Sequence, residues 1–299
     1  MDQLHLMNVF VAVAEEQGFA AASRRLNMSP PAVTRAVAAL ENDLGVILLA
    51  RTTRYVRTTD AGYRYLEDVR RILQDVALAN EAAIGVNAEP KGHLSITAPV
   101  LFGQRYVIPG VVEYLQRYPA TQVEAVLLDR VTNLLEEGFD VGIRIGELPD
   151  SSMRAKKVGS VRILLVASTN YLNTYGIPHS LEDLKQHTLI SSNSGSMPND
   201  WKFEVQGKNT PFHIQPRLKV TTNQAAINAA LENFGITRVI SYQVADELAN
   251  GRLQNVLENF ELPRLPVHIV HRAGRLSSSK VRSFIDLMAK RLSEDLSLN

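Results

Sequence analysis

Arginine is concentrated in one short stretch of this chain, and guanidinium groups suit phosphates and the edges of bases. Between Ala21 and Thr59 there are six arginines against two acidic residues, Glu41 and Asp43, while the first lysine is Lys91. The arginines are Arg24, Arg25, Arg35, Arg51, Arg54 and Arg57. Since the whole chain of 299 residues carries a net charge of only +1, this positive charge is local. The first chemistry that the sequence indicates is therefore a confined nucleic-acid surface.

The elements that would position these arginines are two short helices joined by a tight turn, over residues 19–44. The first helix, over 20–26, is rich in alanine and ends in two arginines, which are favourable at the C-terminal end of a helix dipole. Residues 27 and 28 make the turn. Ser29 then stands where an N-cap belongs, and Pro30 follows at the first helical position, where its missing N–H group costs nothing.

Such a pair is the sequence form of a helix-turn-helix, whose second helix enters the major groove of DNA. Its apolar residues form an inward stripe that leaves Thr34 and Arg35 facing outward. The stripe consists of Ala32, Val33, Ala36, Val37 and Leu40. A helical hairpin buried in an ordinary core would share this pattern, so the pattern alone leaves both interpretations open.

The segment after the second helix favours the DNA-binding interpretation. Gly45 can end the helix, and a short apolar run follows it. Residues 51–59 then alternate bulky and polar side chains, as the two strands of a wing would.

This N-terminal stretch resembles the DNA-binding domain of LysR-type transcriptional regulators. The matching residues are Ala21, Ala22, Leu26, Ser29, Ala32, Val33, Leu40, Glu41, Leu44 and Gly45. Two positions depart from the family motif. Thr34 stands where serine is usual and keeps a hydroxyl group, whereas Pro30 stands where a glutamine often reads a base and removes a side-chain donor.

The resemblance implies contacts to double-stranded DNA from the start of the second helix and from the wing. The residues expected to make them are Ser29, Pro30, Pro31, Thr34, Arg35, Arg51, Thr52 and Arg54. With proline at position 30, base specificity is expected to rest on Thr34, Arg35 and the wing. Arg51 and Arg54 are expected mainly to hold phosphates.

A long helix is expected from Asp60 to about Ala88. Its apolar residues recur in steps of four and three and form a heptad seam, made of Tyr65, Val69, Ile72, Val76, Ala79, Ala83 and Val86. Such a seam favours a homodimer through this helix, and the alternative is a surface helix packed on its own domain. A dimer would place two recognition helices on two half-sites, so a roughly palindromic operator is expected.

Strands and helices alternate after a Pro/Gly-containing linker at residues 87–92, which predicts a parallel sheet with crossover helices. The expected strands are 94–99, 122–128, 140–146, 162–168, 188–192, 218–222, 235–241 and 266–272, with a further element at 201–206. The expected helices are 104–118, 130–137, one from Asn170, 224–233, 243–249 and 280–292. Two lobes hinged by crossing strands would enclose a cleft.

The same span resembles the effector-binding domain of LysR-type regulators, which is itself similar to periplasmic binding proteins. The resemblance is carried by segments 98–103, 118–124, 136–146, 166–178, 232–236 and 250–257. It implies a multidomain chain with an N-terminal, all-α winged helix-turn-helix domain, a long dimerisation helix and a C-terminal α/β effector domain. The expected limits are 1–59, 60–90 and 91–299, with lobe I over 91–161 and 266–299 and lobe II over 162–265.

Ligands of open α/β folds bind at the carboxyl ends of strands, near helix N-termini. That rule, together with the resemblance, selects Pro99, Val100, Phe102, Gly103, Arg144, Gly146, Ser168, Asn193, Thr222 and Asn223. The resemblance implies a small, often anionic, metabolite, and Arg144 would pair with its carboxylate. The alternative for Arg144 is a salt bridge inside one lobe. Val100 stands where many family members carry serine or threonine, so Val100 and Phe102 would make the pocket more apolar.

Other classes of chemistry find little support in the sequence. The chain has no cysteine, which excludes disulfides, thiolate metal sites and cysteine nucleophiles. His268 and His271 lie in an expected strand, where a spacing of three puts the two rings on opposite faces, so no metal site is expected. Ser277 and Lys280 fit a serine-lysine motif, but its partner motifs are absent. No cofactor motif is present, and no enzyme is expected.

The chain is expected to be a soluble, cytoplasmic transcription factor, since it shows neither a signal peptide nor an apolar run long enough to span a membrane. The family resemblance further implies tetramers. Two alternatives stay open at this point: a metabolite-binding protein whose N-terminal helices only dimerise it, and an enzyme built on a binding-protein fold.

Overall fold

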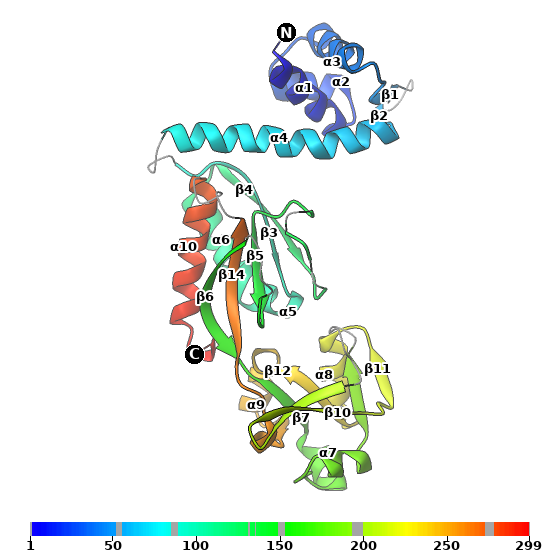
Figure 1. Ribbon diagram of the computed structural model, residues 1–299, viewed down its shortest axis with the longest axis vertical. Helices are drawn as coiled ribbons and strands as arrows, with labels where there is room; N and C mark the ends of the chain where they lie inside the picture. The colour runs from blue at the N-terminus through cyan, green and yellow to red at the C-terminus, as the bar shows by residue number, and fades with distance from the viewer. Residues whose placement is uncertain are drawn as a thin grey trace. The chain divides into compact units, whose positions relative to one another are not determined.

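The computed structural model of the protein describes residues 2–51, 56–84, 89–130, 132–134, 136–148, 153–192, 200–272 and 278–298. The chain divides into two compact units, Met1–Ala88 and Glu89–Asn299, and each is described by itself (Figure 1).

The N-terminal unit is built on three helices, a two-stranded wing and one long helix (Figure 1). They are α1 (Gln3–Glu15), α2 (Phe19–Leu26), α3 (Pro30–Leu44), β1 (Leu49–Arg51), β2 (Val56–Thr58) and α4 (Asp60–Ile84). The expected inward stripe of α3 is confirmed at four of its five positions, since Val33, Ala36, Val37 and Leu40 are buried and Ala32 is half-buried. They share one core with Leu6, Phe10 and Val13 of α1. The predicted helix pair is therefore a helix-turn-helix supported from beneath by α1.

The first turns of α4 also belong to this core, which corrects part of the predicted dimerisation seam. Val69 is completely buried, and the ring centroid of Tyr65 lies 5.6 Å from that of Phe10. Ile72, by contrast, is 42% exposed, and Ala79 is exposed as well. The first part of the predicted seam therefore faces its own domain, whereas Ile72 and Ala79 do not. Ala83 and Val86 of the seam lie outside the side chains that the structure describes.

Lobe I of the second unit contains a five-stranded sheet in the order β4-β3-β5-β14-β6. The strands are β3 (Gly92–Ala98), β4 (Thr121–Leu127), β5 (Val141–Ile145), β6 (Met153–Val161) and β14 (Leu265–Arg272). Only β3, β4 and β5 are parallel, and β14 runs antiparallel to both β5 and β6. The sheet is therefore mixed and not the parallel sheet that the alternating pattern predicted.

One face of this sheet is covered by helices whose apolar residues join it in a single core. They are α5 (Val100–Phe102), a π-helical segment η1 (Gly103–Val107), α6 (Ile108–Arg117), α10 (Ser279–Glu294) and a short 3-10 helix η6 (Leu296–Leu298). Figure 1 shows α10 running along the sheet with the C-terminus at its far end.

The helix predicted over residues 130–137 is wrong, because the described residues there form a bend, turns and irregular backbone. The Glu137 carboxylate accepts hydrogen bonds from the Arg130 guanidinium at 2.8 Å and from the Asn133 N–H group at 3.2 Å. The Glu137 side chain thereby accepts the Asn133 N–H group, which a backbone carbonyl would accept in a helix. Gly138, with a φ of +77°, then turns the chain toward β5.

Lobe II contains a second mixed sheet in the order β11-β8-β12-β7-β13. The strands are β7 (Ile163–Ser168), β8 (Leu189–Ser192), β11 (Leu218–Val220), β12 (Ile236–Ile240) and β13 (Leu253–Val256), with a separate hairpin of β9 (Asp200–Val205) and β10 (Lys208–His213). Strands β11, β8 and β12 are parallel, whereas β7 runs antiparallel to β12 and β13. Strands β6, β10 and β13 were not predicted from the sequence.

Helices of one to three turns complete lobe II. They are α7 (Thr169–Tyr175), η2 (Glu182–Gln186), α8 (Asn223–Leu231), η3 (Ser241–Gln243), α9 (Ala245–Ala249) and η4 (Glu258–Phe260). The chain passes between the lobes twice, from β6 to β7 and from β13 to β14. Among the helices that the structure describes, none is both long and apolar enough to cross a membrane.

Candidate DNA-binding surface and effector site

The N-terminal end of α3 leaves its capping side chain unused. Ser29 is the N-cap, with φ −71° and ψ 143°, but its hydroxyl makes no capping hydrogen bond. Pro30 and Pro31 occupy the next two positions and carry no N–H group, and the Ala32 N–H donates to the Ser29 carbonyl at 2.9 Å. Because Ser29, Pro30 and Pro31 are all exposed, this end of the helix presents a hydroxyl and two rigid apolar rings to solvent.

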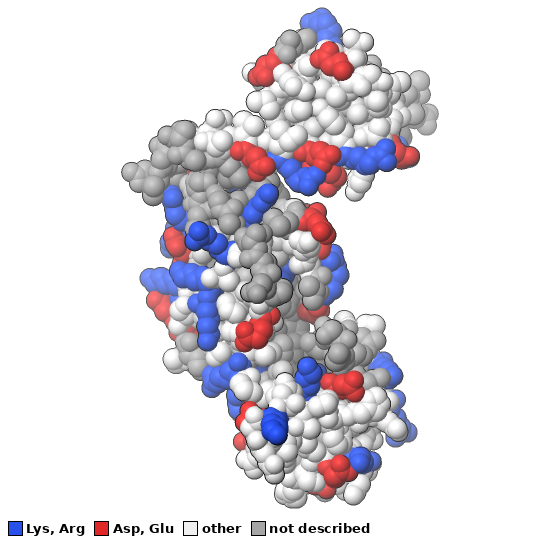
Figure 2. Space-filling model, in the orientation of Figure 1, with Lys and Arg blue, Asp and Glu red and all other residues white. Residues whose placement is uncertain are grey.

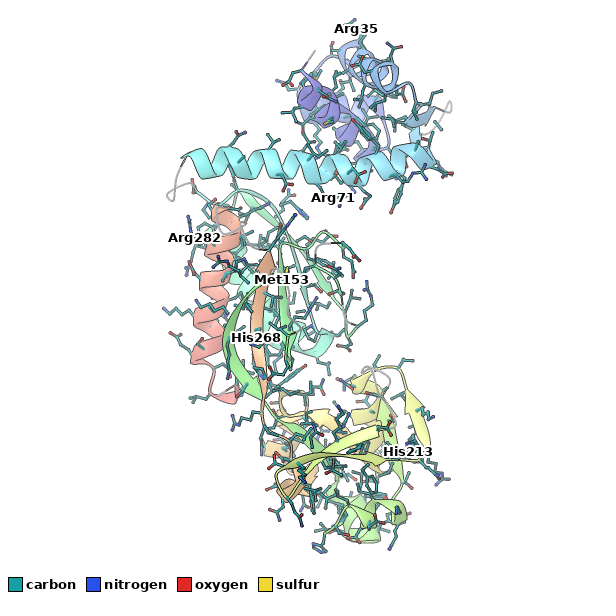
Figure 3. All side chains as sticks on the ribbon, in the orientation of Figure 1. Arg35, Arg71, Met153, His213, His268 and Arg282 are labelled. Atoms are coloured by element: carbon teal, nitrogen blue, oxygen red, sulfur yellow. The ribbon has the colours of Figure 1, made fainter. Side chains whose placement is uncertain are left out.

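Arg35 lies one turn further along α3 and is exposed. Figure 3 labels it on the outer side of this helix, and Figure 2, in the same orientation, shows basic atoms at that end of the unit. Thr34 is half-buried, and its hydroxyl donates to the Pro30 carbonyl at 3.0 Å. Of the two residues expected to meet bases, Arg35 is thus fully available. Thr34 keeps only the lone pairs of its oxygen.

Arg25 was counted with the phosphate-binding arginines, but it forms ion pairs inside the domain. Its guanidinium lies 2.8 Å from Glu15 and 3.3 Å from Glu16, and the hydrogen bond that it donates to Glu15 raises the pKa of Arg25. Glu15 also pairs with Arg70 of α4 at 2.9 Å. The count over residues 21–59 missed these partners because both glutamates lie just before that stretch. The positive charge available to DNA is correspondingly smaller.

Glu41, which matches the family motif, has a structural role. Its carboxylate accepts hydrogen bonds from the N–H groups of Leu48 and Leu49, at 2.8 and 3.0 Å, and so fixes the start of the wing. Strands β1 and β2 pair in antiparallel register, with Ala50 opposite Arg57. The predicted contacts Thr52 and Arg54, and the side chain of Arg51, lie outside the described residues.

In lobe I, two of the candidate effector residues belong to the core. Phe102 is completely buried, and its ring centroid lies 4.8 Å from that of Tyr106. Gly103 is buried too, and a Cβ there would come within 2.4 Å of the Leu127 side chain. Pro99 and Val100 remain half-exposed. The apolar contribution expected from Phe102 is therefore not exposed to a ligand in this state.

Arg144 lies on β5 and is half-buried. It donates to the Ile143 carbonyl at 3.0 Å, to the Thr132 carbonyl at 3.4 Å and to the Thr132 hydroxyl. Burial lowers the pKa of the guanidinium, and Glu137 partly offsets this effect. No carboxylate forms an ion pair with Arg144 among the described residues. The positive charge is therefore held by neutral acceptors, and a ligand carboxylate would be its first direct counter-ion. Gly146 follows with a φ of +109°, and its N–H donates to the Pro266 carbonyl at 2.9 Å.

The candidate residues of lobe II do not all lie at one edge of the sheet. The side chains of Ser192 and Asn223 are hydrogen-bonded to each other, and Thr222 caps α8 by accepting the Ala225 N–H at 3.2 Å. Ser168 ends β7, whose direction opposes that of β8 and β12. Its hydroxyl donates to Asn233 at 2.7 Å, on the edge where β12 begins. The strand-end rule that selected Ser168 therefore does not hold for this strand. Asn193 lies outside the described residues.

The loops that hold the candidate effector residues are called the effector loops below. Two polar residues at these loops were missed by the sequence analysis. Asp129 accepts the Val100 N–H at 3.0 Å, and Thr132 binds Arg144 as described above. Both follow β4, so the strand-end rule that selected Pro99 would have found them had it been applied to this strand.

Family comparisons agree with this architecture over nearly the whole chain. Residues 4–63 match the model of bacterial regulatory helix-turn-helix proteins of the lysR family, and residues 87–293 match the LysR substrate binding domain. The chain belongs to the LysR family of transcriptional regulators. It is a transcriptional regulator with an effector-binding domain, and the two alternative interpretations of the sequence are not favoured.

Named LysR-type relatives are similar along their full lengths. The transcriptional regulator CrgA of Neisseria meningitidis serogroup B is 30% identical over 292 residues, which cover 97% of each chain. PtxR of Pseudomonas aeruginosa is 31% identical over 294 residues, covering 98% of this chain and 94% of that protein.

Solved structures of this family give the same result. The structure of CrgA from Neisseria meningitidis has a TM-score of 0.63 at 29% identity, covering 97% of this chain and 99% of that one. Full-length AphB, a virulence activator of Vibrio cholerae, has a TM-score of 0.62 at 26% identity, with the same coverage. The named relatives are transcriptional regulators.

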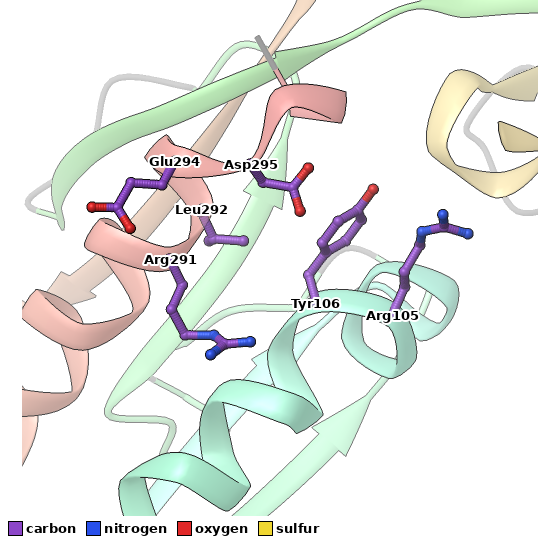
Figure 4. Close-up of a pocket in the computed structure, with 6 residues that line it drawn as sticks. All are labelled: Arg105, Tyr106, Arg291, Leu292, Glu294 and Asp295. Carbon is purple, nitrogen blue, oxygen red and sulfur yellow. The ribbon is translucent and has the colours of Figure 1, made fainter.

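One cavity of this LysR-family effector domain lies beside α10. Its lining, drawn in Figure 4, consists of Arg105 and Tyr106 of η1 and of Arg291, Leu292, Glu294 and Asp295 at the C-terminal end of α10. The cavity has a volume of about 430 Å³. Its cations are already paired, since Arg105 binds Asp246 with two hydrogen bonds and Arg291 lies 2.6 Å from Glu113. None of the predicted effector residues that the structure describes lines this cavity.

The serine-lysine motif has an ordinary structural explanation. Lys280 is buried in α10, and its ammonium group donates to the His93 carbonyl. Ser278 is the N-cap of the same helix. Ser277 lies outside the described residues. The lysine thus ties α10 to β3.

Proposed function

We propose that this LysR-family regulator binds a roughly palindromic, double-stranded DNA operator through the N-terminal end of α3 and the wing. The observation that carries the proposal is the exposed, unused surface formed by Ser29, Pro30, Pro31 and Arg35 on the second helix of the helix-turn-helix. Thr34 would contribute its oxygen as an acceptor. Arg51, Thr52 and Arg54 would hold phosphates from the wing.

Arg35 is the residue on which base specificity mainly rests in this proposal. The two prolines remove N–H donors from the first turn, so the guanidinium supplies the donors that a base edge requires. One good bidentate contact discriminates between bases by about 1–3 kcal/mol. Arg35→Ala should therefore reduce preference for the operator over unrelated DNA by roughly tenfold or more.

Fluorescence anisotropy tests this on DNA from the region beside the protein's own gene, titrated with salt and with unrelated competitor. Arg117→Ala is the matched control, because Arg117 is an exposed arginine on α6 of the other unit that pairs with Glu113. Specific binding should be lost in Arg35→Ala and retained in Arg117→Ala. Equal competitor resistance of wild type and Arg35→Ala would refute the role of α3.

Dimerisation is proposed through the part of α4 that its own domain leaves exposed, which includes Ile72 and Ala79. Tetramers would then form through the second unit. Sedimentation of Ile72→Lys should show loss of dimers, since a charge on the seam is costly to bury.

The proposed domain limits remain 1–59, 60–90 and 91–299. The protein is proposed to act in the cytoplasm.

The effector is proposed to be a small anionic metabolite held between the lobes. Arg144 would meet its carboxylate, with Pro99, Val100 and Gly146 on lobe I and Asn193, Thr222 and Asn223 on lobe II. Binding can change regulation only through unequal affinity for two arrangements of the subunits. The effector therefore has to favour one lobe arrangement over the other.

A further inference from the structure

Three neighbouring strands of lobe I carry basic residues and no acidic residue. Strands β5, β14 and β6 lie side by side at one edge of the five-stranded sheet. None of the three contains aspartate or glutamate, and their arginines and lysines are Arg144, Arg154, Lys156, Lys157 and Arg272. Over the whole chain 32 basic residues nearly balance 31 acidic ones, so this positive charge is a local excess.

The first half of β6 exposes its charges at the edge of the sheet. β6 is the outermost strand, and the four consecutive residues 154–157 are all exposed. Because successive side chains of a strand point to opposite faces, both faces of β6 are open to solvent there. Arg272, the last residue of β14, is exposed as well and lies opposite Met153, which Figure 3 labels. Figure 2 shows basic atoms on the side of lobe I where β6 and α10 lie.

Four exposed cations form what is called the basic edge of lobe I below, namely Arg154, Lys156, Lys157 and Arg272. None of the four forms an ion pair with a carboxylate among the residues that the structure describes. On the neighbouring strand β14, His271 lies opposite Arg154 and His268 opposite Lys157. The basic edge therefore has no acidic neighbour across the strand pair that would offset its charge.

Protection of the sheet edge explains only part of this arrangement. Charged residues on an edge strand, lysine above all, prevent pairing with another chain, and the lysines of β6 would serve that purpose. Arg272 belongs to β14, which is paired on both sides and has no open edge to protect. Like charges that lie close together in a sheet are destabilising. The basic edge would therefore gain free energy from a negatively charged partner.

The shape of the basic edge indicates a polyanion. Its four cations follow one strand and the end of its neighbour, and all four are exposed. A small anion is held by polar groups that converge in a concave pocket. A row of exposed cations instead matches a row of phosphates, as in the backbone of DNA.

The order of the chain connects the basic edge with the DNA-binding unit. Strand β5 is parallel to β3, and β14 runs antiparallel to both β5 and β6. Strand β6 therefore begins, and β14 ends, at the end of the sheet where β3 begins. The linker from the DNA-binding unit enters lobe I at that same end, immediately before Gly92. Lys91, in this linker, is exposed and adds a further cation.

We propose that the basic edge of lobe I holds phosphates of the DNA that flanks the operator. The effector domain thereby contributes directly to DNA affinity. Because these contacts are made with the DNA backbone, they increase affinity and salt dependence but add no sequence preference. The inference rests on the proposed function, which brings the protein to its operator through α3 and the wing.

Fluorescence anisotropy with salt titration of the full chain on two DNAs tests this. The short DNA is the smallest fragment that retains operator binding, and the long DNA adds about 30 bp of unrelated sequence, roughly three helical turns, on each side. The slope of log K against log[salt] should be steeper for wild type on the long DNA. Lys156→Gln combined with Lys157→Gln should reduce that slope by about 2 and leave the slope on the short DNA unchanged.

The matched control is Lys202→Gln combined with Lys208→Gln. Both lysines are exposed on the hairpin of β9 and β10 in lobe II, and neither forms an ion pair among the described residues. This control should keep both wild-type slopes. The proposal is overturned if wild type has the same slope on both DNAs, in which case an acidic protein becomes the partner to seek. It is also overturned if the double variant in β6 keeps the wild-type slope on the long DNA.

The variant Arg35→Ala separates this proposal from the proposed function. It should weaken operator binding on both DNAs alike and leave the difference between their slopes unchanged. If Arg35→Ala binds as wild type does while the difference in slope persists, the role of α3 fails and that of the basic edge stands. If wild type binds neither DNA, both proposals fail.

Cross-linking tests the position of the contact. Because the chain has no cysteine, one introduced cysteine can carry a photo-cross-linker. Ala155→Cys lies within the exposed half of β6 and keeps all four cations, and Asn209→Cys on β10 is an exposed control. Ala155→Cys should cross-link to the flanks of the long DNA, whereas Asn209→Cys should not. Equal yields from the two positions, or no cross-link from Ala155→Cys, would overturn the proposal.

Discussion

The DNA-binding end of α3 and the effector loops differ in how far their polar groups are already used. At α3, Ser29 makes no capping bond and Arg35 is exposed, so the groups that would meet DNA are available without rearrangement. At the effector loops, Arg144 is hydrogen-bonded to Thr132 and Ser192 to Asn223. A surface preformed on one helix can be read from local sequence. A site assembled from several strands has to exchange internal contacts for those of its ligand.

The largest expected effect concerns the rigidity of the DNA-binding end. A Cβ on Gly62 would lie 1.9 Å from the Leu48 carbonyl oxygen, and the Gly62 N–H donates to the Thr59 hydroxyl at 2.9 Å. Because the contact is with backbone, α4 and the wing would have to separate. Gly62→Ala should therefore lower the free energy of unfolding of this unit by roughly 3 kcal/mol or more.

Denaturant unfolding together with DNA-binding anisotropy measures this. Gly18→Ala is the control, since its Cβ would make only an ordinary contact, at 3.7 Å from the Glu16 carbonyl oxygen. If Gly62→Ala unfolds at the same denaturant concentration as Gly18→Ala, the wing is not held as tightly as the structure indicates.

Removal of Arg144 should impair the response to effector at the effector loops and leave the DNA-binding end of α3 unaffected. Arg144→Ala should abolish the change in DNA anisotropy produced by an effector found in a metabolite screen, while affinity for the operator without effector stays within about twofold. It should also lower the stability of the second unit by about 1–3 kcal/mol, because the Thr132 acceptors lose a charged donor. An effector response that survives in Arg144→Ala would remove this residue from the site.

A comparison of two neighbouring arginines sharpens the account of the DNA-binding end. Arg24 is exposed, whereas Arg25 pairs with Glu15 and Glu16. If Arg24 contacts a phosphate, Arg24→Gln should reduce the slope of log K against log[salt] by about 1. Arg25→Gln should leave that slope unchanged and cost about 0.2–1 kcal/mol of stability, as expected for an exposed pair. If Arg25→Gln reduces the salt slope and Arg24→Gln leaves it unchanged, the ion pairs of Arg25 with Glu15 and Glu16 open when the protein binds DNA.

The helix-turn-helix could be predicted from the sequence because its determinants are local: an apolar stripe at helical spacing, a turn, and a proline at the first helical position. The ion-pair partners of Arg25 could not be predicted, since the count of charged residues began at Ala21, after Glu15 and Glu16. The effector loops were harder, because strand direction is not encoded in a strand's own residues. Nothing in residues 162–168 distinguishes β7, which runs antiparallel, from β8, which runs parallel to β12, and Ser168 was misplaced for this reason.

The smallest expected effect is a pH dependence confined to the second unit. The Tyr171 hydroxyl accepts the Thr188 N–H at 2.9 Å and forms a hydrogen bond of 3.2 Å with His187 Nδ1, to which it can donate only while that nitrogen is unprotonated. Burial lowers the pKa of His187, and Asp183 opposes that shift. Below its ordinary pKa of about 6.5 the unfolded chain therefore binds more protons than the folded one, and stability falls as pH drops through that value. His187→Gln should flatten the pH dependence of urea midpoints between pH 7.5 and 5.5. The DNA-binding end relies on guanidinium groups, which do not titrate in this range. If the stability of the N-terminal unit changes equally between pH 7.5 and 5.5, the contrast between the two regions does not hold.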